Sequence, residues 1–193
     1  MRYCKNKFNV MRPTEDLVQE HKAIKVMLGI MKKIADDISV NKRADGDDID
    51  RIIDFLRVFA DKCHHGKEED ALFPAMIVAG MPQKTGPIAV MLEDHALGRK
   101  YIRDLEAAVN NYRAGQPAEI IESAILNYVD LLRGHILKEE SILFPMADRI
   151  LSEETQDQIA GRFALVEEEV IGHGIHERLH ELLEQLQQKY QSV

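Results

Sequence analysis

The chain has 193 residues and a formal net charge of −8, with 25 Lys and Arg against 33 Asp and Glu. This length allows one sizeable hydrophobic core, and the acidic balance disfavours nucleic acid and anionic membranes, which attract clustered positive charge. No segment approaches the roughly 20 apolar residues of a membrane span, and the first residues lack the apolar run of a secretory signal. Two cysteines, Cys4 and Cys63, are too few for a disulfide framework, with a single bridge as the alternative. We therefore expect a cytoplasmic protein with neither nucleic acid nor a membrane as partner.

Apolar residues recur at helical spacing along nearly the whole chain, and no run alternates as a strand would. One such stripe contains Leu17, Ile24, Leu28 and Met31. Glycine, proline and polar clusters interrupt the pattern at 41–46, 80–87, 115–117, around Ser152 and at 172–174. The sequence thus predicts six helical segments.

The first four predicted segments are long and are joined by short connections, which favours antiparallel neighbours. Thr14, followed by Glu15 and Asp16, is predicted to cap the first helix. We expect an all-α fold: an antiparallel up-down four-helix bundle over residues 1–150, with an added C-terminal helical pair at 151–193 packed on it. Apolar stripes through Ile159 and Phe163, and through Leu179 and Leu186, predict that pair.

An internal repeat relates the two halves of the bundle. The segment His-His-Gly-Lys-Glu-Glu-Asp-Ala-Leu-Phe-Pro at 64–74 matches His-Ile-Leu-Lys-Glu-Glu-Ser-Ile-Leu-Phe-Pro at 135–145. The first His, the Lys, the Glu pair and the Leu-Phe-Pro are identical. Each copy follows a segment with one interior histidine, His21 in the first half and His95 in the second. The bundle is therefore predicted to be two similar helical hairpins.

A His and a Glu four residues apart lie one turn from each other on the same helix face. His64 with Glu68, and His135 with Glu139, have this spacing. Imidazole and carboxylate groups that converge inside a bundle form a ligand set suited to non-haem iron. A single interior histidine is more often a core residue, but two buried His and Glu pairs without metal would leave carboxylates unpaired. The predicted metal ligands are His21, His64, Glu68, His95, His135 and Glu139.

These six residues resemble the pattern of the hemerythrin-like HHE cation-binding family: a His, then His-x-x-x-Glu, then a His, then His-x-x-x-Glu. The resemblance covers roughly residues 14–150 and includes the trailing Leu-Phe-Pro of both motifs. It implies an antiparallel four-helix bundle with two iron ions per chain in an oxo- or hydroxo-bridged centre. It does not imply a single activity.

The chain departs from the oxygen-carrying members of that family at two positions. Those members place a second histidine four residues after the one on the third helix, where this chain has Arg99. They also place Asp five residues after the fourth-helix histidine, where this chain has Glu139 at four. We expect the second iron to keep an open position unless His65 or Glu167 occupies it.

The functional expectation is a non-haem di-iron protein that binds or senses dioxygen, nitric oxide or peroxide. The alternatives are a di-iron oxidase or peroxidase, and an iron-storage or structural metal-binding bundle. The chain is expected to be a metal- and oxygen-binding protein rather than a dedicated enzyme, with a small diatomic ligand or peroxide as partner.

Three further features leave alternatives open. His65 and Glu69 repeat the His and Glu spacing about 100° around the helix from His64 and Glu68. Because the repeat aligns Ile136 with His65, His64 is assigned as the ligand and His65 as an additional ligand or a flanking surface residue. Cys63 is either inert packing or a reactive thiol. In the tail, a histidine cluster is either a surface feature or a second metal site; it comprises His173, His176 and His180.

Overall fold

The computed structural model describes residues 11–171 and 175–191, and all regular structure in this part of the chain is helical. The first half contains α1 (Pro13–Asn41), α2 (Gly46–Phe55), η1 (Leu56–His65), η2 (Glu68–Leu72) and α3 (Phe73–Val78). The second half contains α4 (Pro87–Arg113), α5 (Glu119–Lys138), η3 (Glu139–Leu143) and α6 (Phe144–Ile150). The C-terminal part contains α7 (Glu153–Val166), η4 (Glu167–Ile171) and α8 (Ile175–Gln191). The predicted all-helical class is confirmed.

Two of the long helical segments pass through π-helical turns, in which backbone hydrogen bonds skip one residue more than in an α-helix. α2 continues through η1 and η2 into α3, and α5 continues through η3 into α6. η2 and η3 lie within the repeated His and Glu motifs, and η1 ends at the first of them. π-Helical turns are frequent at functional sites, because the wider turn redirects side chains.

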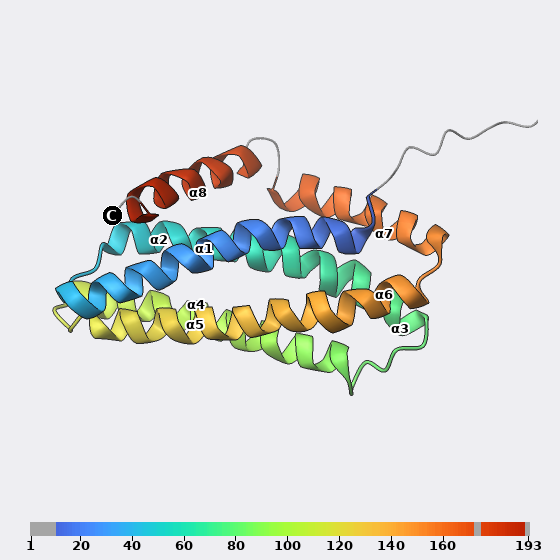
Figure 1. The fold of residues 1–193 in the computed structure, drawn as a ribbon, viewed down its shortest axis with the longest axis horizontal. Helices are drawn as coiled ribbons and strands as arrows, with labels where there is room; N and C mark the ends of the chain where they lie inside the picture. The colour runs from blue at the N-terminus through green and yellow to red at the C-terminus, as the bar shows by residue number, and fades with distance from the viewer. Residues whose placement is uncertain (1–10, 172–174, 192–193) are drawn as a thin grey trace, which may run out of the picture.

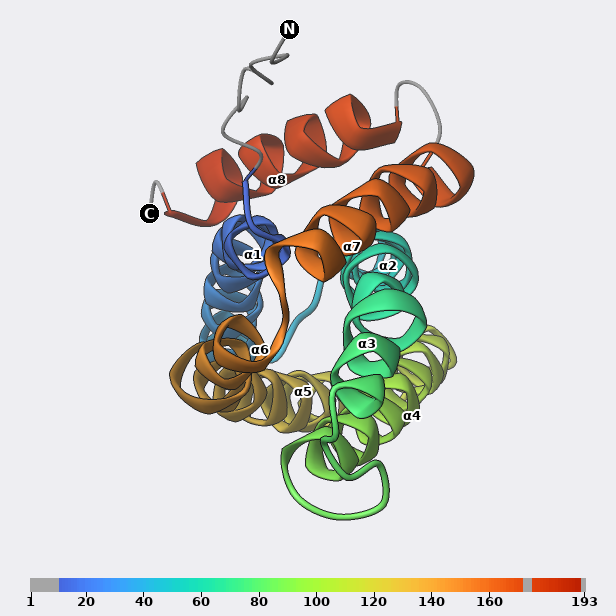
Figure 2. The ribbon, with the colours of Figure 1, turned by 90° about the vertical axis from the view of Figure 1, so that its right-hand side faces the viewer.

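Four helical segments lie side by side along the long axis of the molecule (Figure 1). α1 packs against α5, α5 against α4, and α4 against α2, so the segments surround a common interior (Figure 2). One apolar cluster fills the part of this interior that includes Met31, Phe55 and Val129. A second fills the part that includes Leu17, Phe73 and Phe144. In each segment the interior His and Glu residues lie near the boundary between the two clusters.

The C-terminal helices pack on the outside of this bundle. α8 contacts α1 and α2, α7 contacts α1 and η2, and η4 contacts η1 (Figure 2). Ile159 and Phe163 of α7 belong to the same apolar cluster as Leu17 and Phe73. The division into 1–150 and 151–193 stays a prediction.

The predicted start of the first helix is wrong by two residues. The helix begins at Pro13, so Thr14 lies inside its first turn rather than at its cap. The Thr14 hydroxyl donates to Oδ1 of Asp148, 2.8 Å away in α6. The backbone N–H of Arg12 donates to the Glu15 carboxylate, at 3.2 Å. Proline suits the first helical position because its missing N–H would have no partner there, and this explains the earlier start.

Among the described residues, no helix is long and apolar enough to cross a membrane.

Candidate metal centre

Seven buried side chains form two adjoining groups in the bundle interior. Within each group the potential donor atoms lie within 4.8 Å of one another. One group contains His21, His64 and Glu139. The other contains His65, Glu68, His95 and His135. The structure thus brings together all six residues predicted from the sequence and adds His65.

The two glutamates lie between the groups. Oε2 of Glu139 is 3.2 Å from Nε2 of His21, and its Oε1 is 3.1 Å from Nε2 of His135. Oε2 of Glu68 is 3.4 Å from Nε2 of His95 and 4.0 Å from Nε2 of His64. Each carboxylate therefore faces one histidine of each group, as a carboxylate shared by two metal ions would.

Most of the potential metal-donor atoms that face the interior have no hydrogen-bond partner; the exceptions are Nε2 of His21 and Nε2 of His64, which lie 3.0 Å apart. The buried atoms without a partner are both ring nitrogens of His65, both carboxylate oxygens of Glu68 and of Glu139, Nε2 of His95 and Nε2 of His135. A buried polar atom without a partner costs about 1–3 kcal/mol, and more when it is charged. Cations held between the two groups would satisfy these lone pairs, so the residues present fit a metal centre.

The pKa shifts of the buried carboxylates and of His135 also indicate that a cation would stabilise this site. Burial and the neighbouring charge of Glu139 raise the pKa of Glu68 well above its usual range. Burial opposes ionisation of Glu139 too, but the charge of His135, together with hydrogen bonds from His135 and His21, outweighs it and holds the pKa of Glu139 well below its usual range. Burial likewise lowers the pKa of His135, yet the Glu139 charge and the hydrogen bonds with Asp94 and Glu139 together outweigh it and raise that pKa to about 9. Without metal, these shifts favour a proton on Glu68 and on His135, which reduces the negative charge of the buried site.

The neighbouring imidazoles favour the neutral form that coordinates metal. Burial lowers the pKa of His64 and of His65 well below the usual range, and the nearby histidines add to this effect. Neutral imidazole is the ligand form for iron and zinc.

Each of four histidines is oriented by a carboxylate on its outer nitrogen. The Nδ1 contacts are His21 to Glu140 at 2.9 Å, His64 to Glu20 at 2.7 Å, His95 to Glu69 at 2.7 Å and His135 to Asp94 at 3.3 Å. A carboxylate on Nδ1 fixes the ring orientation and leaves Nε2 to face the interior. This is the usual arrangement around metal-ligating histidines.

A cation holds each of these outer carboxylates in turn. The contacts are Lys25 to Glu140 at 2.7 Å, Lys67 to Glu20 at 2.7 Å, Arg99 to Glu69 at 2.8 Å, and Lys138 to Asp94. The arrangement follows the internal repeat, because Lys67 aligns with Lys138 and Glu69 with Glu140. Reasoning from the sequence missed these residues. The identity of the Lys and of the second Glu in both motifs was the signal that could have identified them.

His65 lies in the interior, although the alignment of the repeat with Ile136 favoured His64 alone as the interior histidine. Its ring stacks on that of His95 with centroids 3.9 Å apart, and only 4% of the residue is exposed. His64 and His65 both end the π-helical segment η1. Successive residues are rotated less around a π-helix than around an α-helix, so neighbouring side chains can share one face. Glu69 lies outside the two groups, where it contacts His95 and Arg99.

Arg99 and Glu167 contact other residues rather than facing the interior. Arg99 reaches Glu69 and Asp61, at 2.8 and 2.7 Å. Glu167 pairs with the ammonium group of Lys67, so it does not occupy the position that the missing histidine leaves.

Two further candidates from the sequence are Cys63 and the histidine cluster of the tail. Cys63 is a buried free thiol, and burial raises its pKa to about 12, which matches the inert alternative. The histidine cluster of the tail falls outside the described residues: His173 entirely, and His176 and His180 in their side chains.

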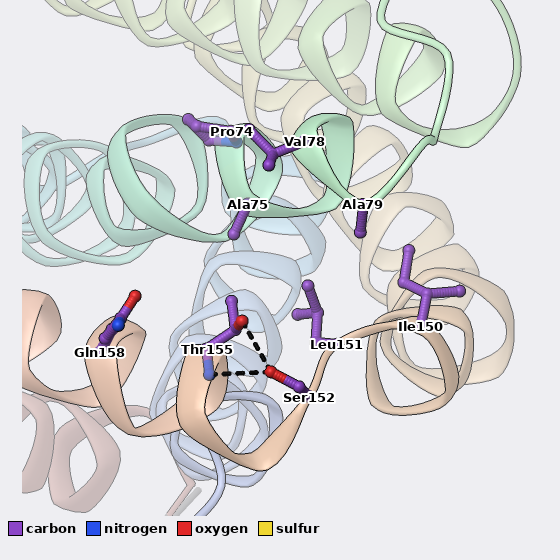
Figure 3. A pocket seen from close by; sticks show the side chains of 9 residues that line it. All are labelled: Pro74, Ala75, Val78, Ala79, Ile150, Leu151, Ser152, Thr155 and Gln158. Atoms are coloured by element: carbon purple, nitrogen blue, oxygen red, sulfur yellow. Dashed lines mark hydrogen bonds between the residues drawn. The ribbon is translucent and has the colours of Figure 1, made fainter.

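A separate pocket of about 460 Å³ lies at the end of the bundle (Figure 3). It is formed by α3, the end of α6 and the start of α7, with Pro74, Val78 and Ile150 among its lining residues. None of the seven interior residues lines it. The pocket is therefore not part of the candidate metal centre.

A helical bundle whose interior collects histidines and carboxylates from facing helices belongs to a known class of metal-binding bundles. The sequence profile described as the Hemerythrin HHE cation binding domain matches residues 12–147. The chain belongs to this family, as the sequence motifs predicted. A search of curated proteins finds no match, and neither does a search of solved structures.

Proposed function

We propose that this chain binds two iron ions between its two groups of histidines and carboxylates, and that it binds or senses dioxygen, nitric oxide or peroxide there. The observation that carries the proposal is the set of partnerless buried donor atoms, divided between two groups that share Glu68 and Glu139. The family match and the packing of neighbouring segments also support an antiparallel up-down order of the four long helices.

The two proposed metal positions differ in their histidines. His21 and His64 serve one position, and His65, His95 and His135 serve the other, with Glu68 and Glu139 between them. The position with two histidines has fewer protein donors, so we propose it as the place where a small ligand binds. Iron ions would supply the redox chemistry when bound, while the protein supplies oriented ligands and an interior closed by apolar residues.

A binding or sensing role follows from the surroundings of the site. The apolar clusters at either end of the site disfavour entry of bulky polar substrates. We also propose that the protein is cytoplasmic, as its low cysteine content suggests. The buried free thiol of Cys63 supports this, because free thiols persist in a reducing compartment.

Two measurements test the proposal. Metal analysis of protein produced with ample iron should approach two iron ions per chain; a limit of one, or zinc retained in preference to iron, would contradict it. Optical spectroscopy of the anaerobic ferrous protein exposed to dioxygen or nitric oxide should then show a stable adduct. Repeated turnover would favour the oxidase or peroxidase alternative, and no reaction with two irons present would favour storage or a structural role.

A further inference from the structure

Lys25 and Arg99 are equivalent residues in the two halves of the bundle. Each follows an interior histidine by four residues, His21 in one case and His95 in the other. Each also contacts the second glutamate of a repeated Glu pair. Lys25 contacts both carboxylate oxygens of Glu140, at 2.7 and 2.8 Å. Up to this point the two halves are alike.

Arg99 makes a second contact that Lys25 does not make. Its Nε donates to Oδ1 of Asp61 at 2.7 Å, while its Nη2 donates to Oε1 of Glu69 at 2.8 Å. Asp61 lies one turn before His65, and the same Oδ1 atom is 3.5 Å from Nδ1 of His65. Glu69 orients His95 through Nδ1. One guanidinium thus joins the carboxylates beside two stacked histidines.

Two residues of this arrangement, Asp61 and His65, lie at positions where the two halves of the internal repeat differ. The repeat aligns Asp61 with Leu132 and His65 with Ile136, so the other half has neither the carboxylate nor the third histidine. A guanidinium presents its donors in a fixed planar fork, whereas a lysine ammonium group is a point charge on a flexible stem. An arginine can therefore hold two carboxylates in a defined relative position, and a lysine cannot do so equally well.

We propose that Arg99 is a positioning residue that aligns His65 and His95 together, and so determines the affinity and geometry of the three-histidine metal position. Arg99 stands on α4 where oxygen-carrying members of the family have a histidine. In this chain Arg99 instead positions His65, a histidine that η1 supplies. This inference rests on the proposed two-metal site. Lys25 positions only His21 and serves the other metal position.

Titration of the metal-free full-length chain with Co²⁺ tests the proposal, because the visible spectrum of Co²⁺ reports the ligand geometry of each position. Wild type should bind two ions with two distinct spectra. Arg99→Met should weaken one of them by roughly 10- to 100-fold, the usual effect of removing an outer partner of a metal ligand, and should alter its spectrum. His65→Gln should affect the same ion, which assigns it.

Lys25→Met is the matched control and should affect only the other ion. Arg99→Lys should restore part of the affinity but not the wild-type spectrum, since one ammonium group cannot reproduce the fork. Asp61→Asn should weaken the same ion as Arg99→Met, and the double variant should show less than the sum of the two effects because both remove one interaction.

The outcomes separate this inference from the function on which it rests. If wild type binds two Co²⁺ ions and Arg99→Met changes neither, or if Arg99→Met and Lys25→Met weaken the same ion, the positioning role is wrong while the two-metal proposal stands. If wild type binds fewer than two ions, both proposals are overturned. Urea unfolding of each metal-free variant controls for folding, and Asp61→Asn carries the test if Arg99→Met does not fold.

Discussion

Nδ1 of His64 lies 2.7 Å from Oε2 of Glu20, which directs the other ring nitrogen of His64 towards Nε2 of His21, 3.0 Å away. Glu20 and His21 are consecutive on α1, so one turn of this helix supplies a candidate ligand and the group that orients another. The other oxygen of Glu20 accepts from Lys67 at 2.7 Å. The geometry of His64 therefore depends on residues of both α1 and the repeated motif.

Replacing Glu20 by Gln should weaken metal binding without removing any candidate ligand. The loss of the charged partner lowers the basicity of His64 and loosens its orientation, and such changes cost roughly 10- to 100-fold in metal affinity. Competition with a chelator of known affinity would measure the effect. Glu93→Gln is the control, since Glu93 is an exposed carboxylate beside Asp94. Equal affinities of the two variants would show that Glu20 does not orient a ligand.

Replacing Glu68 by Met should have opposite effects on the metal-free and metal-loaded protein. Glu68 is fully buried and neither of its carboxylate oxygens has a hydrogen-bond partner. An apolar side chain of similar size should therefore stabilise the metal-free protein, by about 1–3 kcal/mol, the usual cost of a buried polar group without a partner. Iron should stabilise the wild type further and the variant much less, because binding energy adds to folding energy.

Glu69→Met provides the control for that experiment. Glu69 is partly exposed and contacts both His95 and Arg99, so its removal should destabilise the metal-free protein. Urea unfolding with and without iron measures both variants. If Glu68→Met destabilised the metal-free protein, its carboxylate would have partners other than a cation.

The helical segments and the convergence of six His and Glu residues in the interior could be predicted because glycine and proline breaks, helical periodicity and the repeat are local features. The interior position of His65 could not be predicted in the same way, because successive residues of an ideal α-helix are rotated by about 100° and His65 would point away from His64. Only the π-helical turn at the end of η1 brings both inside. A sequence pattern of period 3.6 carries no sign of such a turn.

The outer carboxylates and cations were within reach of the sequence but were not identified. Lys67 and Lys138 are identical positions of the repeat, and Glu20 and Asp94 both precede the interior histidine. Treating these residues as solvated charges missed that they contact one another across helices. The surface on which α8 packs was beyond prediction, because an apolar stripe shows that a helix is covered but not by which neighbour.

Lys67 should contribute far more to stability than Lys138, although the repeat aligns them. Lys67 is fully buried and contacts Asp16, Glu20 and Glu167, whereas 39% of the Lys138 side chain is exposed and it contacts Asp94. Lys67→Met should cost about 3 kcal/mol, the low end for a broken buried pair because two of its partners reach water. Lys138→Met should cost less than about 1 kcal/mol. Urea unfolding of the metal-free proteins compares them, and similar losses would contradict the burial of Lys67.

Glu167→Ala should leave the binding of small exogenous ligands nearly unchanged. The Glu167 side chain is 48% exposed and pairs with Lys67, and it belongs to neither group of interior donors. Because Lys67 keeps Asp16 and Glu20 as partners, loss of this half-exposed pair should cost less than about 1 kcal/mol. Azide or nitric oxide titration of the iron-loaded protein should therefore give affinities within about twofold of wild type. The opposite result, a marked strengthening of ligand binding in Glu167→Ala, would mean that Glu167 leaves Lys67 and caps an iron when metal is present. Lys67→Met, compared with the Lys67→Met/Glu167→Ala double variant, distinguishes the two cases further, because both release Glu20 and only the single variant leaves Glu167 free. Weaker azide binding in Lys67→Met than in the double variant would show that the lysine keeps the Glu167 carboxylate away from the metal.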